Sequence, residues 1–186
     1  MPLIEWLDDN AEDVTVYSEK LDLLYIKSLS PEIVVSYNYR YIIKEDIVSL
    51  MDGRIINLHI SLLPWNRGAD PNLWSFIEDS PKGVTIHYVD KGIDTGNILL
   101  QEAADFDENI ETLRSSYKIL HEKIQLLFIN NWDKIKNLQI IPRAQSGHGS
   151  FHYSNELVKI KEALGEQIWS LPIRELKQKL ADMHLR

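Results

Sequence analysis

The chain has 186 residues, of which 44% are hydrophobic and 26% charged, and its net charge is −8. This length suits a single domain that buries a sizeable core without help from a metal ion or a disulfide. The absence of cysteine excludes disulfides, cysteine–zinc sites and cysteine nucleophiles. The sequence has no apolar run of membrane-spanning length, no basic signal-peptide start, and an acidic balance that disfavours nucleic acid. We therefore expect a cytoplasmic protein without membrane or nucleic-acid partners.

The first third of the chain alternates between helical and strand-like patterns. Helical spacing or capping predicts helices over residues 2–10, 19–29 and 44–51, the last followed by Gly53 as a C-cap. Alternating or continuous apolar runs predict strands over residues 13–17, 32–36 and 54–60. The continuous runs suit strands that are buried on both faces of a parallel sheet.

The middle of the chain, residues 61–96, is rich in proline and glycine and predicts loops rather than long regular elements. Strands are expected over residues 84–89 and 98–101. Apolar side chains spaced three and four apart from Leu113 to Phe128 predict a helix, with Asn109 as its N-cap. Two further short helices are expected over residues 158–164 and 173–183. The alternation predicts an α/β domain with a mainly parallel sheet over residues 1–145 and a helical extension over 146–186.

The strand over residues 54–60 carries the residues best suited to chemistry. Asn57 and His59 are two positions apart and so project from the same face of the strand, at its junction with the loop-rich region. A histidine beside an amide donor suits a reaction that develops charge on oxygen, and Asp94 lies in a glycine-flanked loop that brings a carboxylate close. From the residues alone, a core histidine and a turn-forming aspartate remain the more common alternatives.

The motifs N-L-H-I-S-L-L-P from Asn57, G-V-T-I-H ending at His87 and D-T-G from Asp94 resemble the formyltransferases that use 10-formyltetrahydrofolate. The similarity spans residues 32–101 and implies a Rossmann-like formyltransferase fold. It also implies that Asn57, His59 and Asp94 are catalytic: the first two stabilise the oxyanion, and Asp94 helps the amine's proton to reach the leaving folate. The implied cofactor is 10-formyltetrahydrofolate, with no metal.

The resemblance also implies a folate-binding loop after the strand over residues 32–36. The residues carried over are Tyr39, Arg40, Tyr41 and Ile42, together with His87 on the strand before Asp94. An ordinary apolar corner between strand and helix is the alternative for the loop, and His87 suits structural support as well as catalysis. Gln101 closes the pattern and is expected to be structural.

The segment over residues 65–74 indicates the acceptor. Its form W-N-R-G-A-D-P-N-L-W is most similar to nucleotide-sugar N-formyltransferases, which implies Trp65, Arg67 and Trp74 as substrate-binding residues and a nucleotide-linked amino sugar as acceptor. Packing of the loop is the alternative for at least one tryptophan. Purine-precursor and methionyl-tRNA acceptors remain open, although the acidic composition disfavours tRNA. His148 and His152 lie four apart, but the glycines beside them disfavour a helical metal site.

The start of the chain differs from the family pattern. Members usually begin with a strand and a small-residue turn, whereas residues 2–10 already look like the first helix. We therefore expect the family's first strand to be absent and the chain to be some 15–25 residues short of its relatives, about a strand and a turn. The alternative function is a truncated, catalytically impaired relative that acts as a folate-binding or interaction module. A homodimer is possible.

Overall fold

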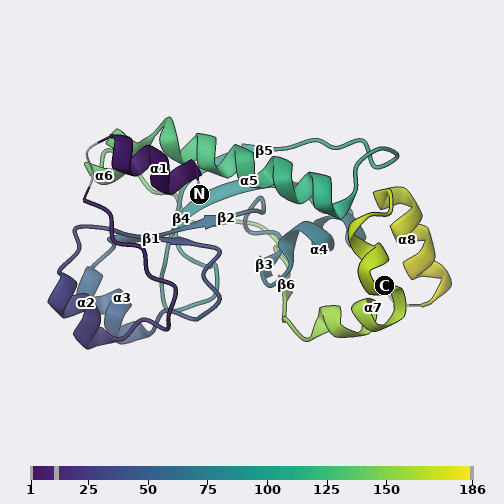
Figure 1. Cartoon of the computed structure of the whole chain (residues 1–186), viewed down its shortest axis with the longest axis horizontal. Helices are drawn as coiled ribbons and strands as arrows, with labels where there is room; N and C mark the ends of the chain where they lie inside the picture. The colour runs from purple at the N-terminus through teal and green to yellow at the C-terminus, as the bar shows by residue number, and fades with distance from the viewer. Residues whose placement is uncertain (1, 11–12, 185–186) are drawn as a thin grey trace.

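The structure, a computed structural model, describes residues 2–10 and 13–184. Its centre is a four-stranded sheet in the order β1-β2-β4-β5 (Figure 1). The strands are β1 (Val34–Tyr37), β2 (Ile55–His59), β4 (Gly83–Tyr88) and β5 (Ile98–Ala103). The expected α/β class and four of the five expected strands are therefore confirmed, with shifts of a residue or two at their ends.

The strand directions correct one expectation. β1 and β2 are parallel, with Ser36 beside Asn57, but β4 runs antiparallel to both β2 and β5. The sheet is mixed rather than mainly parallel. Residues 89–97, which join β4 to β5, are too few for the crossover that a parallel pair needs, so an antiparallel connection follows from the loop length.

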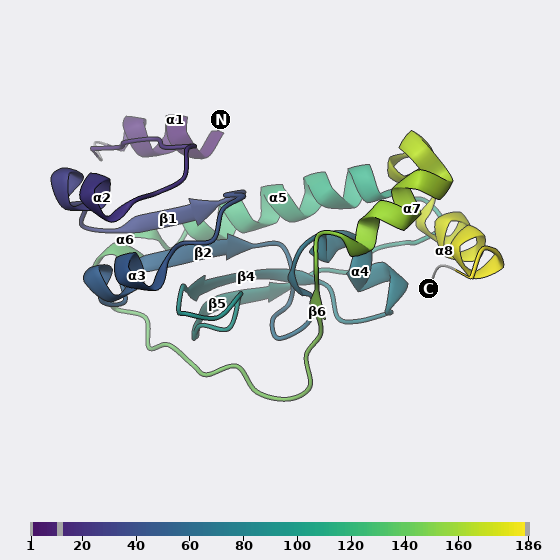
Figure 2. The same ribbon diagram turned by 90° about the horizontal axis from the view of Figure 1, so that it is seen from below.

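Helices cover both faces of this sheet (Figures 1 and 2). On one face lie α1 (Pro2–Asp9), α5 (Leu113–Ile129) and α6 (Trp132–Lys136), and on the other lie α2 (Leu23–Leu29) and α3 (Glu45–Met51). The inner side chains of α5, including Leu120, Ile124 and Phe128, are at most 1% exposed and pack against β2 and β4. Burial of this apolar stripe is what fixes α5 on the sheet.

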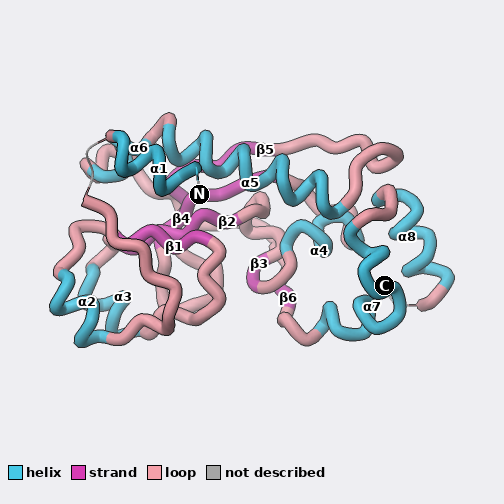
Figure 3. Tube along the Cα trace, in the orientation of Figure 1, coloured by secondary structure: helices cyan, strands magenta, loops and turns pink. Residues whose placement is uncertain are grey.

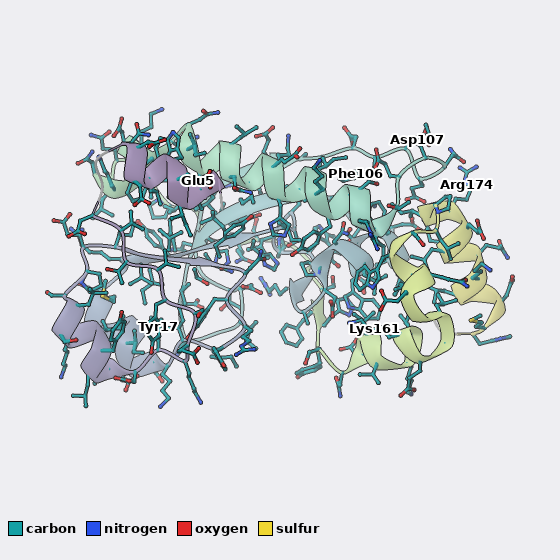
Figure 4. All side chains as sticks on the ribbon, viewed as in Figure 1. Glu5, Tyr17, Phe106, Asp107, Lys161 and Arg174 are labelled. Carbon is teal, nitrogen blue, oxygen red and sulfur yellow. The ribbon has the colours of Figure 1, made fainter. Side chains whose placement is uncertain are left out.

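A second cluster of helices, from the C-terminal part of the chain together with α4, has its own core. Its elements are α4 (Pro71–Ile77), α7 (Glu156–Leu164), the 3₁₀ helix η1 (Gly165–Trp169) and α8 (Ile173–Asp182). Apolar side chains of all four pack together with Leu113 at the start of α5. Phe106, labelled in Figure 4, packs against both cores and lies edge-on to Phe76 with ring centroids 5.5 Å apart. The predicted C-terminal helices are confirmed.

Three local predictions are wrong. Residues 13–17 form no strand: they run as coil between α1 and α2 (Figure 3), and Val16 is 61% exposed. α2 begins at Leu23 rather than residue 19, because Asp22 caps it by accepting from the Tyr25 amide at 2.8 Å. Thr112 rather than Asn109 caps α5, in a reciprocal pair with Ser115. Among the described residues, no strand precedes β1.

Candidate active site

The three predicted catalytic residues meet at one edge of the sheet. Asn57 and His59 extend from the same face of β2, and Asp94 reaches them from the loop between β4 and β5. The Asn57 side-chain amide donates to Asp94 Oδ1 at 3.2 Å, and His59 Nδ1 lies 3.9 Å from Asp94 Oδ2. The structure thus brings together residues that are up to 37 positions apart in sequence.

The surroundings of His59 define its proton arrangement. Its Nε2 lies 3.1 Å from the Asn66 carbonyl oxygen, which only accepts, so Nε2 carries the proton and Nδ1 faces Asp94. Burial lowers the pKa of His59 below its ordinary value of 6.5, against the opposing effect of the Asp94 carboxylate. His59 is therefore uncharged at neutral pH, with a free lone pair directed towards the carboxylate.

His87 on β4 supports the same group. Its Nδ1 lies 2.8 Å from the Tyr88 carbonyl oxygen and therefore donates, which leaves Nε2 to accept from the Asn57 amide at 3.3 Å. The same Nε2 is 3.5 Å from Asp94 Oδ1, and the His59 and His87 rings are edge-to-face at 6.1 Å. The structure places His87 among the catalytic candidates, where the resemblance implied a folate contact.

Asp94 is held as a carboxylate. Burial alone would raise its pKa, but His59, His87 and the backbone amide of Gly68 favour the charged form and hold the pKa well below its usual value of 3.8. The Gly68 amide donates to Oδ2 at 2.9 Å. The site thus combines an ionised carboxylate, an uncharged imidazole and an amide donor, which suits proton transfer beside an oxygen that gains negative charge.

The loop after β2 is fixed by side chains of β4 and β5. Thr85 donates its hydroxyl to the Ser61 carbonyl at 2.7 Å, and Gln101 donates to the Leu63 carbonyl at 2.7 Å and to the Thr85 hydroxyl at 2.9 Å. Arg143 in turn donates to Gln101 at 2.7 Å. Gln101 therefore has the structural position expected for it, and it secures the loop that follows His59.

Gln145 belongs to the site although the sequence gave no reason to select it. Its side-chain amide donates to the carbonyls of Asp94 and Gly96 at 2.8 and 2.9 Å. Its oxygen accepts from Arg67 Nε and Nη2 at 3.0 and 2.6 Å. Gln145 is half-buried, while its neighbours over residues 141–149 are exposed, and this burial is visible only in the folded chain.

The segment after Gln145 completes the same wall. β3 (Arg67–Gly68) pairs in parallel with β6 (Phe151–His152), and the Ser150 hydroxyl accepts from the Asn66 amide at 3.0 Å. These contacts hold the Gly68 amide against Asp94. They also show that residues beyond 145, where we expected the extension to begin, help to form the site; the domain boundary itself stays a prediction.

The predicted acceptor residues have different surroundings. Trp74 is 8% exposed and stacks on His152 with ring centroids 4.2 Å apart, so it packs the loop. Trp65 is half-buried, and its carbonyl accepts from the Ser61 hydroxyl at 2.8 Å. Arg67 is joined to Asp94 through Gln145. Of the three, Arg67 is the one that the structure connects, through Gln145, to the catalytic candidate Asp94.

The predicted folate loop follows β1 next to β2. Its first strand neighbour, Tyr37, lies beside Leu58, one residue from both Asn57 and His59. Within the loop, Tyr39 donates to the Glu19 carbonyl at 2.9 Å, Arg40 lies over the Tyr41 ring at 4.8 Å, and Ile42 is 74% exposed. The loop therefore borders the site and leaves apolar surface open beside it. In the part of the chain that the structure describes, no group of three or more His, Asp or Glu side chains is arranged so that it could hold a metal ion.

This fold and this grouping define the class. Residues 9–130 match the family model described as formyl transferase, and the chain belongs to that family. Among solved structures, it is similar to the formyltransferase PseJ from Anoxybacillus kamchatkensis, in complex with UDP-4,6-dideoxy-4-formamido-L-AltNAc and tetrahydrofolate. That match has 45% identity and a TM-score of 0.87 and covers 94% of this chain and 91% of PseJ. A sugar N-formyltransferase from Shewanella sp. is 26% identical with a TM-score of 0.69, covering 84% of this chain and 61% of that one.

Curated relatives include methionyl-tRNA formyltransferases. The protein from Thermodesulfovibrio yellowstonii is 37% identical over 66% of this chain, and that from Clostridioides difficile is 34% identical over 81% of it. The chain covers 40% and 48% of the length of these two relatives. None of the helices in the described residues is long and apolar enough to span a membrane.

Proposed function

We propose that the protein transfers the formyl group of 10-formyltetrahydrofolate to the amine of a nucleotide-linked amino sugar. The observation that carries this proposal is the grouping of an ionised Asp94, an uncharged His59 and the Asn57 amide within hydrogen-bonding or ion-pair reach of one another. The match to PseJ over 94% of the chain supports the acceptor class. Formyl transfer needs a hydrogen-bond donor to the developing oxyanion and a proton acceptor for the amine, and the three residues supply both.

The residues divide the work as follows. An Asn57 amide hydrogen, exchanged from its 3.3 Å contact with His87 Nε2, would be donated to the formyl oxygen as that oxygen gains negative charge. His59 Nδ1 has a free lone pair and accepts the proton of the attacking amine; once protonated, it gives a proton to the folate nitrogen as the bond between that nitrogen and the formyl carbon breaks. The 3.9 Å between Nδ1 and Asp94 Oδ2 leaves the carboxylate close enough to stabilise the imidazolium.

The binding residues follow from their places around this centre. The loop of Tyr39 to Ile42 borders β2 and would receive the folate ring, largely through backbone groups. 10-Formyltetrahydrofolate supplies the formyl carbon and the leaving nitrogen. Arg67 would meet a phosphate of the acceptor, because two of its nitrogens are held by Gln145 while the third remains for a ligand oxygen.

Methionyl-tRNA is a second candidate acceptor, because curated methionyl-tRNA formyltransferases are 34–37% identical to this chain. Two observations favour the sugar. Identity to PseJ is higher, at 45%, and the net charge of −8 opposes binding to a polyanion. A cytoplasmic location and a homodimer stay predictions.

A direct assay tests the proposal. The protein is mixed with 10-formyltetrahydrofolate and one acceptor at a time. The acceptors are UDP- and dTDP-linked 3-amino and 4-amino sugars and methionyl-tRNA, and release of tetrahydrofolate is followed by absorbance. We expect release with a sugar nucleotide only. Release with methionyl-tRNA only would assign the second acceptor, and release without any acceptor would indicate a hydrolase. Binding of 10-formyltetrahydrofolate with no release of tetrahydrofolate in any mixture would contradict the proposal of an enzyme and favour a binding module.

A further inference from the structure

Gln145 is anchored where it can act on the catalytic loop. Arg143, two residues earlier, forms an antiparallel bridge with Ile98, with backbone hydrogen bonds of 2.8 and 2.9 Å. Ile98 is the first residue of β5 and follows the Asp94 loop directly. The bridge therefore fixes the backbone of this exposed segment against the end of the loop that carries Asp94.

The side chain of Gln145 is fully used. Both amide hydrogens are donated, to the carbonyls of Asp94 and Gly96, and the oxygen accepts two bonds from Arg67. The carbonyl partners only accept and the guanidinium only donates, so the orientation of the amide is settled by its partners. The hydrogen bonds made by Gln145 therefore span Thr95 and hold both ends of a three-residue turn.

The turn needs such support. Asp94 has a positive φ of 53°, a left-handed conformation that residues with a side chain adopt less readily than glycine. Strain of this kind persists when neighbouring contacts over-determine the backbone. At the other end, a Cβ on Gly96 would collide with the Tyr88 carbonyl, so the turn is also tightly packed there. Loss of the Gln145 donors would free the strained end to relax.

We propose that Gln145 is a positioning residue for formyl transfer, which holds Asp94 in its left-handed conformation and so keeps its carboxylate facing His59. Only the kinetic tests of this inference rest on the proposed function. The N–H groups of Gln145 that bond the Asp94 and Gly96 carbonyls, rather than its contact with Arg67, hold Asp94 in place. Asp94 and His87 are the titratable groups that face His59 in this arrangement.

The kinetic test compares variants in formyl transfer. Gln145→Met keeps the length of the side chain and removes its donors, and Gln139→Met is the control because Gln139 is exposed. We expect Gln145→Met to lower kcat about tenfold or more, with the KM for folate changed less than about twofold. Gln145→Glu still accepts from Arg67 but places oxygen against the two carbonyls, and should lose as much. Wild-type kcat in Gln145→Glu would overturn the proposal.

A double-variant cycle separates positioning from general damage. If Gln145 acts through Asp94, adding Gln145→Met to Asp94→Asn should lower the residual kcat by less than about twofold, because the group being positioned is already lost. Equal losses in both backgrounds would show an independent structural role and would overturn the proposal.

A third readout does not require activity. In protein with isotope-labelled histidines, the titration of His59 is followed by NMR and assigned with His59→Gln. Displacement of Asp94 removes the carboxylate that favours the charged imidazole, so the pKa of His59 should fall in Gln145→Met and stay unchanged in Gln139→Met. An unchanged titration in Gln145→Met would contradict the proposal. If the pKa of His59 falls in Gln145→Met while the wild-type protein transfers no formyl group, the positioning role is upheld and the proposed function is rejected.

Discussion

The side-chain amide of Asn57 donates to the carboxylate of Asp94 at 3.2 Å, so two of the three catalytic candidates are bonded directly to each other. The second carboxylate oxygen accepts from the Gly68 amide at 2.9 Å. Asp94 thus orients the Asn57 amide on β2 and is itself held by the Gly68 amide on β3. A substitution at either partner should therefore change the position of the Asp94 carboxylate.

Replacement of Asp94 by asparagine tests the carboxylate. Asparagine keeps the size of the side chain and tolerates a positive φ, so the fold should survive. We expect kcat to fall by about a hundredfold or more, because the carboxylate that stabilises the imidazolium of His59 is lost. Circular dichroism and single-turnover formyl transfer check the outcome. Lys91→Gln, an exposed change in the same loop, should behave as wild type; near-wild-type turnover in Asp94→Asn would remove Asp94 from the mechanism.

The pH dependence of kcat/KM tests the state of His59. Burial lowers its pKa below 6.5, and Asp94 stays ionised because its own pKa is depressed. The active form is therefore present at neutral pH and is lost as the pH falls through the lowered pKa of His59. We expect an acid limb with a midpoint below 6.5. An acid limb with a midpoint at or above 6.5 would contradict the lowered pKa, and loss of activity as the pH rises through the pKa of His59 would show that the protonated imidazole is the working form.

His121 should make stability depend on pH. Burial lowers the pKa of His121 from 6.5 to about 4. Its Nδ1 shares a hydrogen bond of 2.6 Å with the Tyr37 hydroxyl, whose pKa burial raises to about 12. Between pH 4 and 6.5, His121 binds a proton in the unfolded chain but not in the folded chain. The free energy of unfolding should therefore fall as the pH drops from 6.5 towards 4.

The variant His121→Asn isolates this contribution, because asparagine still offers an acceptor to Tyr37. Urea unfolding across the same pH range should show a shallower decline in the variant than in wild type. The comparison also removes the parallel contribution of His59, which both proteins share. Identical slopes would mean that His121 does not stay neutral in the folded state.

Two glycines with positive φ form a matched pair. Gly68, with φ 86°, leaves no room for a Cβ against the His152 carbonyl, whereas Gly53, with φ 76°, has nothing within 4 Å. Gly53→Ala should lower stability by about 1 kcal/mol through backbone strain alone and retain activity. Gly68→Ala should in addition separate β3 from β6 and lower kcat about tenfold or more, since the amide on Asp94 moves. Equal effects of the two changes would contradict the role of β3 in the site.

The core of α5 should be sensitive to truncation. Phe128 is fully buried and packs against Trp132 with ring centroids 5.0 Å apart. Phe128→Ala should lower the free energy of unfolding by about 3–5 kcal/mol, because it leaves a cavity between the helix and the sheet. Leu126→Ala, at a position that is 57% exposed, should change it by less than about 0.5 kcal/mol. Denaturant unfolding of both variants measures the difference.

Local hydrophobic patterns were enough to predict the strands and the helix whose apolar residues form a continuous run or a regular spacing. The continuous apolar runs of β1, β2 and β4 and the three-and-four spacing of α5 are properties of short windows, and burial selects them directly. The face shared by Asn57 and His59 followed from the geometry of any strand. The prediction that Asn57, His59 and Asp94 are catalytic came from a family resemblance, since a histidine and an aspartate in these settings are usually structural.

Other features depend on contacts that no window contains. Residues 13–17 alternate like a strand but find no strand partner, so the pattern alone was misleading. β3 and β6 are two residues each, too short for any periodicity to be seen. Gln145 is recognisable only through its partners Asp94, Gly96 and Arg67, which the fold brings from 49 to 78 positions away.

The contact between the Ser150 hydroxyl and the Asn66 amide joins residues 84 positions apart, and the β3–β6 pairing depends on it and its neighbours. Closing so long a segment is entropically unfavourable. The sheet and α5 are built from residues before 130, whereas the pairing that holds Gly68 needs residues 150–152. We therefore expect a nascent chain that ends before residue 150 to lack the backbone contacts that keep the Gly68 amide against the carboxylate of Asp94.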